Sequence, residues 1–320
     1  MKNETILITG ACGQLGTELV TTLRKYYKRV LATDLKDAVE ALGDAEFRKL
    51  DVLHRQGLYE VIQKEKVTQV YHLAAILSAT GEQQPELAWR VNMKGLRNVL
   101  EICSTSGVKK VFFPSTIAVF GSTTPRTHTP QHTSTEPATI YGISKLAGEL
   151  WCQWYFLNKN LDVRSLRYPG LISYKTKAGG GTTDYAVDIF FAAVKDKKYN
   201  CFLEKDTVLP MMYMPDAVRG TIELMEAPAE RISVRTAYNF AGFSCSPAQI
   251  AVVITRFIPE FQITYAPDFR QKIADSWPQS IDDQPARNDW GWLPEYDLDK
   301  MVEDMLFNLL KTKEKHTVLP

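Results

Sequence analysis

The chain has 320 residues, 45% of them hydrophobic, and its 38 basic and 37 acidic side chains leave a formal net charge of +1. This composition is typical of a globular protein with one large core or two unequal lobes, and it excludes a disordered or fibrous chain. Because the charges are spread along the sequence, they give no basic surface for nucleic acid or an anionic membrane. We therefore expect a small-molecule ligand, with neither nucleic acid nor a membrane as partner.

The five cysteines are an odd number and contain no C-x-x-C pair, so we expect neither a disulfide framework nor a zinc site. His128 and His132 are too few ligands for a metal, and we predict none. No apolar run approaches the ~20 residues that span a bilayer. The first predicted strand begins almost at Met1, which leaves no room for a signal or transit peptide in the chain as given, although a processed precursor would look the same.

Alternating strand and helix patterns fill the first half of the chain. Short apolar runs predict buried strands, and amphipathic stretches predict helices. The strands are expected at 5–9, 29–34, 47–52, 69–74, 109–115 and 163–167, and the helices at 14–25, 58–64, 84–105 and 140–160. Such alternation implies parallel strands joined by helices. We therefore predict an α/β fold with a doubly wound parallel sheet of the Rossmann type.

After Gly170 the alternation becomes irregular, and the glycine run at 179–181 indicates a flexible stretch. We predict a smaller α/β lobe in this part of the chain, which would bind the substrate. A strand-like segment at 238–242 is expected to return to the main sheet. The predicted boundaries are 1–170 for the domain of the main sheet, with 233–245 returning to it, and 171–232 with 246–320 for the second lobe.

A glycine-rich loop joins the first predicted strand to the first predicted helix. Gly10, Gly13 and Gly16 permit a tight turn and the close approach of a pyrophosphate to the helix N-terminus. Asp34 ends the second strand, 18 residues past Gly16, where a carboxylate accepts hydrogen bonds from both adenosine ribose hydroxyls and repels a 2′-phosphate. Leu35 follows rather than an arginine, so the pattern predicts NAD in preference to NADP.

Further cofactor candidates lie where the third and fourth predicted strands end. Ligands of doubly wound sheets bind at the carboxyl ends of the strands. Asp51 and Val52 end the third strand, and the run Leu73–Ala75 follows His72 in the fourth. We expect Asp51 to reach the adenine and Ala74 to line the adenosine channel. His72 is more simply interpreted as a packed residue.

Tyr141 and Lys145 lie four residues apart and therefore on one face of the predicted helix 140–160. An unperturbed tyrosine titrates near ~10. A fixed positive charge beside the phenol would let its oxygen accept a proton at neutral pH. The pair is a catalytic device if a cofactor lies beside it.

The motifs together resemble a known enzyme family. The glycine loop, Asp34, Asp51-Val52, Asn92, Ser115-Thr116 and Tyr141-x-x-x-Lys145 occur in an order that resembles the extended short-chain dehydrogenase/reductase superfamily over nearly the whole chain. Segments 167–176 and 209–216 carry a narrower resemblance, as do Gly179-Gly-Gly-Thr-Thr-Asp-Tyr-Ala186 and Asp275-Ser-Trp-Pro-Gln-Ser-Ile-Asp-Asp283. These segments look like the short-chain type of L-threonine 3-dehydrogenase. That resemblance implies oxidation of L-threonine by NAD to 2-amino-3-ketobutyrate.

The resemblance also implies the roles of individual residues. Tyr141, as phenolate, would take the proton from the threonine β-hydroxyl, and Lys145 would lower the pKa of Tyr141 and hold the nicotinamide ribose. Thr116, with Ser115 as its runner-up, would orient the reacting oxygen. Asn92 would support a proton relay, although a helix-surface asparagine is a nearly equal interpretation. The residues implied to contact the cofactor are Gly10, Gly13, Gln14, Leu15, Gly16, Asp34, Asp51, Val52, Leu73, Ala74, Ala75, Asn92, Ser115, Tyr141, Lys145, Tyr168 and Pro169.

Threonine brings a carboxylate and an ammonium, so its pocket needs donors and acceptors close to Tyr141, Thr116 and Ser115. We expect Ser78 and the pair Thr182-Thr183 to supply them, with Trp277 closing the pocket. The residues Thr182, Thr183 and Asp184 also fit a helix N-cap cluster, and Trp277 fits a core residue, and these alternatives stay open. The glycine run 179–181 is interpreted as the hinge of a lid that excludes water.

Apolar stripes on the predicted helices 84–105 and 140–160 include Leu96, Val99, Leu100, Leu146, Leu150 and Tyr155. In relatives the matching helices form a four-helix interface, so the resemblance implies a homodimer. The alternative is that both stripes pack on the sheet. The resemblance further implies functional coupling to a 2-amino-3-ketobutyrate coenzyme A ligase, and it leaves the mitochondrial matrix and the cytoplasm open as compartments.

Two other functions stay open. A nucleotide-sugar epimerase or dehydratase shares the fold, the glycine loop and the Tyr/Lys pair, and its diphosphate would need basic residues such as Arg219, Arg231 and Arg235. An NAD-binding regulator without turnover is the second alternative, for which oxidation of Cys12 would be the signal. An intact Tyr141 and Lys145 argue against a regulator, because a sensor needs no base.

Overall fold

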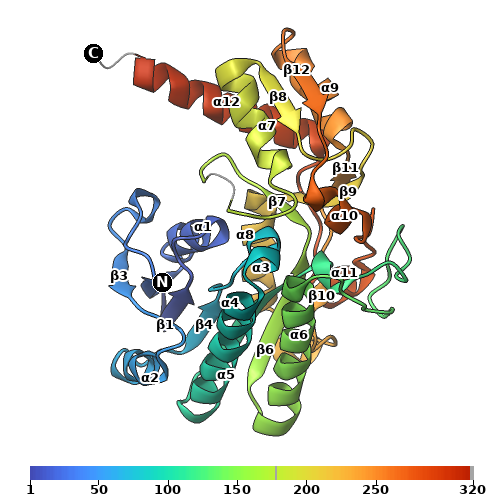
Figure 1. The fold of residues 1–320 in the computed structure, drawn as a ribbon. Helices are drawn as coiled ribbons and strands as arrows, with labels where there is room; N and C mark the ends of the chain where they lie inside the picture. Colours follow the sequence, from blue (N-terminus) through green and yellow to red (C-terminus); the bar gives the residue numbers. More distant parts are fainter. Residues whose placement is uncertain (177–178, 318–320) are drawn as a thin grey trace.

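The computed structural model describes residues 1–176 and 179–317 of the chain. Within these residues the central sheet has seven strands in the order β10-β6-β5-β4-β1-β2-β3, all paired in parallel (Figure 1). Its strands are β1 (Lys2–Thr9), β2 (Tyr27–Asp34), β3 (Glu46–Lys49), β4 (Gln69–His72), β5 (Lys110–Thr116), β6 (Asp162–Tyr168) and β10 (Tyr238–Asn239). The order reverses direction at β1, which confirms the predicted doubly wound fold.

Helices cover both faces of this sheet because its strands are apolar on both sides. Leu7 faces a core with α2, α5 and α6, whereas its neighbours Ile6 and Ile8 face a core with α1 and α8. The helices that follow the strands are α1 (Gln14–Leu23), α2 (Arg55–Lys64), α3 (Ser78–Gln83), α4 (Pro85–Trp89), α5 (Gly95–Thr105), α6 (Ile140–Lys159) and α8 (Met214–Glu226). Short 3-10 turns are η1 (Glu40–Leu42), η3 (Ile117–Val119) and η4 (Ala229–Arg231).

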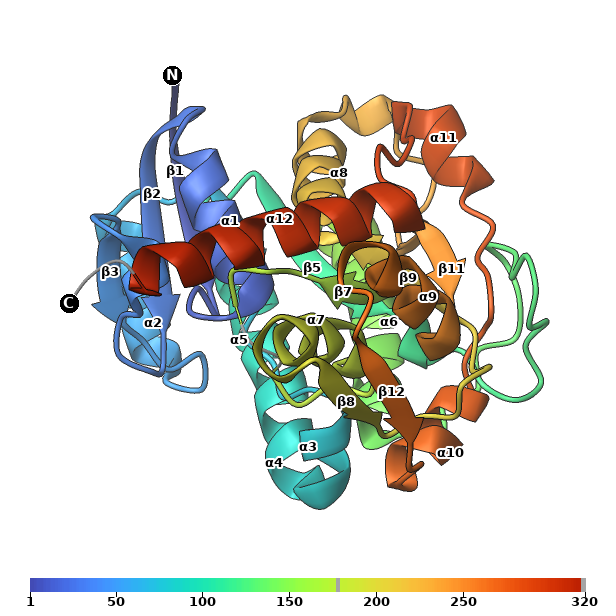
Figure 2. The same cartoon turned by 90° about the horizontal axis from the view of Figure 1, so that it is seen from above.

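A second lobe lies above the carboxyl ends of the central strands (Figure 1). It contains the small sheets β11-β9-β7 and β12-β8, and α12 lies across its top (Figure 2). Its elements are β7 (Gly170–Ile172), α7 (Tyr185–Asp196), β8 (Lys198–Cys201), β9 (Leu209–Tyr213), β11 (Phe243–Cys245), α9 (Pro247–Phe257), β12 (Gln262–Tyr265), α10 (Phe269–Asp275), α11 (Gln284–Trp290) and α12 (Leu298–Thr317). The chain crosses between the two parts, since β10 pairs with β6 and α8 packs against α1 and β6.

The expected helix 84–105 is interrupted. Its first part is α4, a π-helical segment η2 (Arg90–Lys94) follows, and α5 completes it. The third and fourth strands end earlier than expected, at Lys49 and His72, so Asp51 and the run Leu73–Ala75 lie in the loops beyond them. Among the described residues, no helix combines the length and apolar character needed to cross a membrane.

Candidate active site

The glycine loop between β1 and α1 is a close-packed cradle. Gly10 has φ +69°, and a Cβ on it would lie 2.6 Å from the backbone nitrogen of Ala74. A Cβ on Gly16 would lie 2.5 Å from the carbonyl oxygen of Gly10. Helix α1 has no side-chain cap and no acidic residue in its first turn. The N-terminus of α1 therefore directs the positive end of the helix dipole at this cradle, as a pyrophosphate site requires.

Asp34 lies beside this cradle, at the end of β2. Its Oδ2 accepts a hydrogen bond of 3.0 Å from the N–H of Cys12, and its Oδ1 accepts one of 3.0 Å from the N–H of Lys36. A carboxylate has about four lone-pair sites, so two remain for ribose hydroxyls. Asp51 accepts a 2.8 Å bond from the N–H of Leu53, which fixes the loop beyond β3. Both aspartates lie at the edge where a nucleotide is expected.

Close packing of α6 on the turn η3 brings Tyr141 to Thr116. Thr139 caps the helix by accepting a 3.0 Å hydrogen bond from the N–H of Gly142. A Cβ on Gly142 would lie 2.1 Å from the carbonyl oxygen of Ala118, so only glycine permits this contact. The Thr116 hydroxyl accepts from the N–H of Ala118 at 3.2 Å and hydrogen-bonds the Tyr141 phenol.

Burial dominates the electrostatics of Tyr141 and Lys145. It raises the pKa of Tyr141 to about 12, against the hydrogen bond from Thr116, which lowers it. Burial lowers the pKa of Lys145 to about 7, while the neighbouring Cys152 and Glu149 side chains raise it. The Lys145 ammonium lies 5.7 Å from the centre of the Tyr141 ring and donates a 2.6 Å bond to the carbonyl of Pro114.

In this arrangement Lys145 is not among the groups that shift the pKa of Tyr141, and its expected effect on that pKa stays a prediction. The physical reason is that the ammonium is directed at a backbone carbonyl, and both groups are buried in surroundings that disfavour charge. If Tyr141 became a phenolate while Lys145 was an ammonium, the two opposite charges would stabilise each other. A single buried charge has no such partner.

Asn92 is buried in the π-helical segment η2 and is not the helix-surface residue that the sequence left open. Its Oδ1 accepts a 2.8 Å hydrogen bond from the N–H of Ile76, and its Nδ2 donates to the carbonyl of Ile76 and to the hydroxyl of Ser144. Ser144 in turn donates to the carbonyl of Tyr141 at 2.8 Å. The π-bulge thus ties the loop after β4 to the first turn of α6.

The expected substrate residues come from both the domain of the main sheet and the second lobe. Ser78, at the start of α3, and Thr182, before α7, are buried with their hydroxyl oxygens 3.1 Å apart. Thr183 packs against the start of β7, because a Cβ on Gly170 would lie 2.9 Å from its Cβ. Trp277 is buried in the core of the second lobe, in the same cluster as Ile117–Phe120.

Two predicted residues direct their side chains elsewhere. The Ser115 hydroxyl donates a 2.5 Å hydrogen bond to Glu149 and is committed to that carboxylate. The Tyr168 ring packs edge-on against Phe112 and Phe240, and its hydroxyl bonds to Thr221 of α8. Only the backbone of these two residues can therefore border a ligand at the sheet edge.

Sequence reasoning missed two polar residues that shape the site, Ser144 and Asn98, and gave Asp184 only as part of an N-cap cluster. Ser144 bridges Asn92 and Tyr141, and its signal was its position three residues after Tyr141 in the same motif. Asp184 accepts 2.8 Å hydrogen bonds from the N–H groups of Gly180 and Gly181. Asn98 donates to the carbonyl of Val52 at 2.9 Å and gave no signal in the sequence. Within the described ranges, no group of three His, Cys, Asp or Glu side chains could hold a metal.

Comparison with known proteins agrees with this geometry. The model of the NAD dependent epimerase/dehydratase family matches residues 6–241. A Staphylococcus haemolyticus (strain JCSC1435) protein described as an uncharacterized epimerase/dehydratase is 45% identical over 318 residues, which cover 98% of this chain and 99% of that protein. The chain belongs to the NAD dependent epimerase/dehydratase family. Membership confirms the predicted resemblance to extended short-chain dehydrogenases/reductases, and a nucleotide cofactor fits the glycine loop of this family member.

Two solved structures related to this epimerase/dehydratase family member carry a more specific description. The GalE-like L-threonine dehydrogenase from Cupriavidus necator, in its holo form, is 56% identical, covers 95% of this chain and 99% of its own, and has a TM-score of 0.93. A monomeric L-threonine 3-dehydrogenase from a metagenome database, in its apo form, is 46% identical, covers 96% of this chain and 99% of its own, and also has a TM-score of 0.93.

Proposed function

We propose that this protein is an NAD-dependent L-threonine 3-dehydrogenase that oxidises the β-hydroxyl of L-threonine to give 2-amino-3-ketobutyrate. The observation that carries the proposal is the contact between Tyr141 and Thr116 at the carboxyl edge of a sheet shared with threonine dehydrogenases. A hydroxyl bound at this contact meets a proton acceptor and a hydrogen-bonding partner at the same point.

NAD is the proposed cofactor, and when bound it accepts the hydride from the substrate carbon. The fit rests on the N-terminus of α1, which has no side-chain cap, on the cradle that a Cβ on Gly10 or Gly16 would fill, and on the carboxylate of Asp34. The carboxylate favours NAD because it would repel a 2′-phosphate. The proposed cofactor residues otherwise remain those of the sequence prediction, with Ser115 and Tyr168 contributing backbone only.

The residues of the chain would move one proton and hold the substrate. Tyr141 takes the proton from the β-hydroxyl, and Thr116 keeps the reacting oxygen in line with it. Lys145 stabilises the phenolate once its ammonium turns from Pro114 towards Tyr141. Asn92 supports this exchange by holding the first turn of α6 through Ser144.

Substrate recognition is proposed for the polar groups around this point. The buried hydroxyls of Ser78 and Thr182 already bond to each other, so one can turn towards a carboxylate or ammonium without losing all its partners. Thr183 would complete the pocket beside Gly170, with Trp277 behind Thr116 as part of its wall. The product would pass to a coenzyme A ligase. The staphylococcal relatives favour the cytoplasm over the mitochondrial matrix as the compartment.

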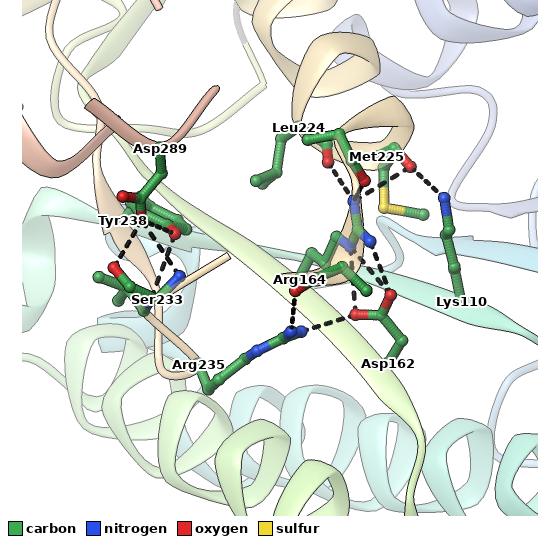
Figure 3. A network of polar contacts seen from close by, with 12 residues as sticks. Lys110, Asp162, Arg164, Leu224, Met225, Ser233, Arg235, Tyr238 and Asp289 are labelled. Atoms are coloured by element: carbon green, nitrogen blue, oxygen red, sulfur yellow. Dashed lines mark hydrogen bonds and ion pairs between the residues drawn. The ribbon is translucent and has the colours of Figure 1, made fainter. Parts of the chain in front are cut away.

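The nucleotide-sugar alternative is weakened because two of its candidate arginines already form ion pairs within the protein. Arg219 pairs with Asp216 and Glu223 on its own helix α8. Arg235 pairs with Asp162 at the amino end of β6, the end remote from the glycine loop (Figure 3). A diphosphate bound in the second lobe would have to break these ion pairs.

The test is the appearance of the reduced-nicotinamide absorbance when L-threonine is added with NAD. We expect a rise that is specific to L-threonine over serine and allo-threonine, and to NAD over NADP. Tyr141→Phe should lower kcat at least about 100-fold, because it removes the base. Tyr155→Phe is the matched control, since this tyrosine lies on the same helix but packs in the core on the sheet, and it should leave kcat unchanged.

Absence of a rise with every amino acid would refute the dehydrogenase proposal. Nucleotide sugars would then be the next substrates to test. NAD that stays bound through purification would point to an epimerase, which regenerates its cofactor in each cycle, whereas a dehydrogenase exchanges it.

A further inference from the structure

A buried ion pair lies one helical turn beyond Lys145. Glu149 of α6 and Arg167 of β6 are both buried. Glu149 Oε1 accepts from Arg167 Nε at 2.9 Å, and Oε2 accepts from Nη2 at 2.7 Å. Two buried charges are costly to place unless the pairing is two-pronged and the remaining polar atoms are bonded. Neither residue is among those proposed to move the proton, although the Glu149 charge raises the pKa of Lys145.

The ion pair also contacts Ser115, the residue next to Thr116 of the proposed site. Glu149 Oε1 accepts a 2.5 Å hydrogen bond from the hydroxyl of Ser115, which directly precedes Thr116 in β5. Glu149 lies four residues after Lys145, on the same face of α6. One carboxylate therefore connects the strand that carries Thr116 to the helix that carries Tyr141 and Lys145.

On its other side the pair reaches the second lobe. Arg167 Nη1 donates to the side-chain oxygen of Asn239 and to the carbonyl of Gln131, each at 3.2 Å. Asn239 Nδ2 donates at 3.0 Å to the carbonyls of Thr129 and Asp282. The segment 280–282 forms a bridge with Thr129 and directly follows the turn that holds Trp277.

We propose that the Glu149–Arg167 pair is a positioning unit that fixes Thr116, Tyr141 and Lys145 relative to segment 280–282 of the second lobe. The proposal rests on the dehydrogenase function proposed above, because that function requires groups from both parts to meet one substrate. Since a displacement of about 1 Å can lower a rate about 100-fold, a fixed spacing between these parts has a large kinetic effect.

The chain contains a matched pair for comparison. Arg164 lies on β6 three residues before Arg167, is also buried, and binds Asp162 through Nε and Nη2 (Figure 3). Its Nη1 donates to the carbonyls of Leu224 and Ala227 at the end of α8. This second pair lies at the amino end of the strand and touches none of the residues proposed for the reaction. A purely structural role would make the two pairs equivalent.

The experiment compares Glu149→Gln with Asp162→Asn. Each change removes one carboxylate charge from a buried arginine and keeps the side-chain length. Glu149→Gln should lower kcat roughly 10- to 100-fold with L-threonine at a temperature well below unfolding. NAD affinity should change less than about two-fold, because the glycine loop lies across the sheet. Asp162→Asn should keep kcat even if it lowers Tm as much. Equal kcat in the two folded variants would overturn the proposal.

Hydrogen exchange provides a readout that does not depend on turnover. The amides of Thr129, Gln131 and 280–282 should exchange faster in Glu149→Gln than in the wild type, and should be unchanged in Asp162→Asn. Unchanged exchange in both variants would also overturn the proposal. If the wild type does not oxidise threonine but exchange follows this pattern, the dehydrogenase function fails and the coupling between the two parts stands.

Ser115→Ala serves if Glu149→Gln does not fold, because it removes one hydroxyl and leaves the ion pair intact. We expect kcat to fall with the KM for L-threonine unchanged, since a positioning residue acts on the transition state. An increase in KM alone would mean that Ser115 binds substrate directly, and that result would contradict the proposal.

Discussion

The side chains of Tyr141 and Lys145 share surroundings that oppose the charge on each. Burial raises the pKa of Tyr141 to about 12 and lowers that of Lys145 to about 7, so both groups are driven towards their neutral forms. A neutral phenol cannot take a proton from an alcohol. Of the contacts in the structure, the hydrogen bond from Thr116 is the one that lowers the pKa of Tyr141. The Thr116 hydroxyl therefore controls how much phenolate is present at a given pH.

Thr116→Val should displace the rising limb of the kcat profile to higher pH. The pKa of Tyr141 is raised in the folded protein, so activity grows as pH rises towards that value, and loss of the Thr116 bond raises it further. A hydrogen bond to a charged group contributes about 1.5 to 3 kcal/mol, and one pKa unit is about 1.4 kcal/mol. We expect a displacement of about one to two pH units. It is measured by following kcat from about pH 6 to about pH 10, below the raised pKa of Tyr141.

Thr116→Ser is the matched control for this prediction. It keeps the hydroxyl that bonds Tyr141 and the N–H of Ala118, and should retain the wild-type profile. If the valine and wild-type profiles superimpose, the hydroxyl of Thr116 does not set the basicity of Tyr141.

For single residues, the sequence predicted which positions lie near the site more reliably than it predicted the directions of their side chains. The spacing of Tyr141 and Lys145, and the place of Thr116 at the end of β5, located the reacting edge. Ser115 and Thr116 alternate faces of a strand, and no pattern in the chain tells which one turns to Glu149. The direction of Tyr168 is fixed by its contact with Thr221 of α8, a residue 53 positions away, which local pattern cannot supply.

At the scale of elements, the helices that follow β4 show why one periodic pattern supports two interpretations. Leu96, Val99 and Leu100 were predicted as part of a dimer stripe, but they are buried in the core with Tyr155. This part of the prediction is wrong because the sheet needs that face. The π-helical segment was not predicted either; within it Asn92 bonds to Ile76 and Ser144, contacts that the local sequence pattern does not contain. Element type followed from sequence, whereas local distortion depended on tertiary contacts.

The glycine run at 179–181 is predicted to be the hinge of a lid over the site. Gly180 has φ +95°, and its N–H donates to Asp184 at the start of α7. As a lid hinge, this run should exchange its amide hydrogens quickly in the free protein and slowly with NAD and L-threonine. Gly180→Ala strains the hinge by about 1 to 2 kcal/mol and should raise the KM for L-threonine several-fold.

Gly107→Ala is the control for this hinge, because Gly107 also has a positive φ, of +74°, and nothing lies within 4 Å of its added Cβ. It should lower stability by a similar amount and leave KM unchanged. If amides 179–183 exchange as slowly as those of the central sheet, and do not respond to NAD with L-threonine, the run is a fixed turn.

At the scale of the whole molecule, the two parts are joined by more than one passage of the chain. The predicted boundaries treat 171–232 as second lobe, whereas α8 within it packs on α1 and the central sheet, and β10 extends that sheet beyond β6. We retain the boundaries as a proposal for how the substrate lobe is connected. Several crossings limit how far the parts can move independently, which fits a site made from both.

The homodimer stays a proposal, and its interface is now assigned to exposed apolar residues of α6, of which Leu150 belonged to the predicted stripe. α4, α5 and α6 lie side by side on one face of the molecule (Figure 1). Leu150, Trp154 and Leu157 of α6 are 55%, 43% and 69% exposed, and Ile143 precedes Leu150 by two turns. Their spacing of seven, four and three residues places them on one helix face, as in a helix-to-helix seam. A contiguous exposed apolar stripe is typical of an interaction surface.

Sedimentation velocity at micromolar concentration should therefore give twice the chain mass of 36.2 kDa. Leu150→Glu places a charge in the centre of the seam and should weaken the dimer at least about ten-fold, since an unpaired buried charge is costly. Leu293→Glu is the control, because Leu293 is 58% exposed but lies far along the chain in the loop after α11. One related threonine dehydrogenase is described as monomeric, so the fold alone does not decide assembly. A wild-type protein that sediments as a monomer would show that the exposed stripe on α6 is not a dimer interface.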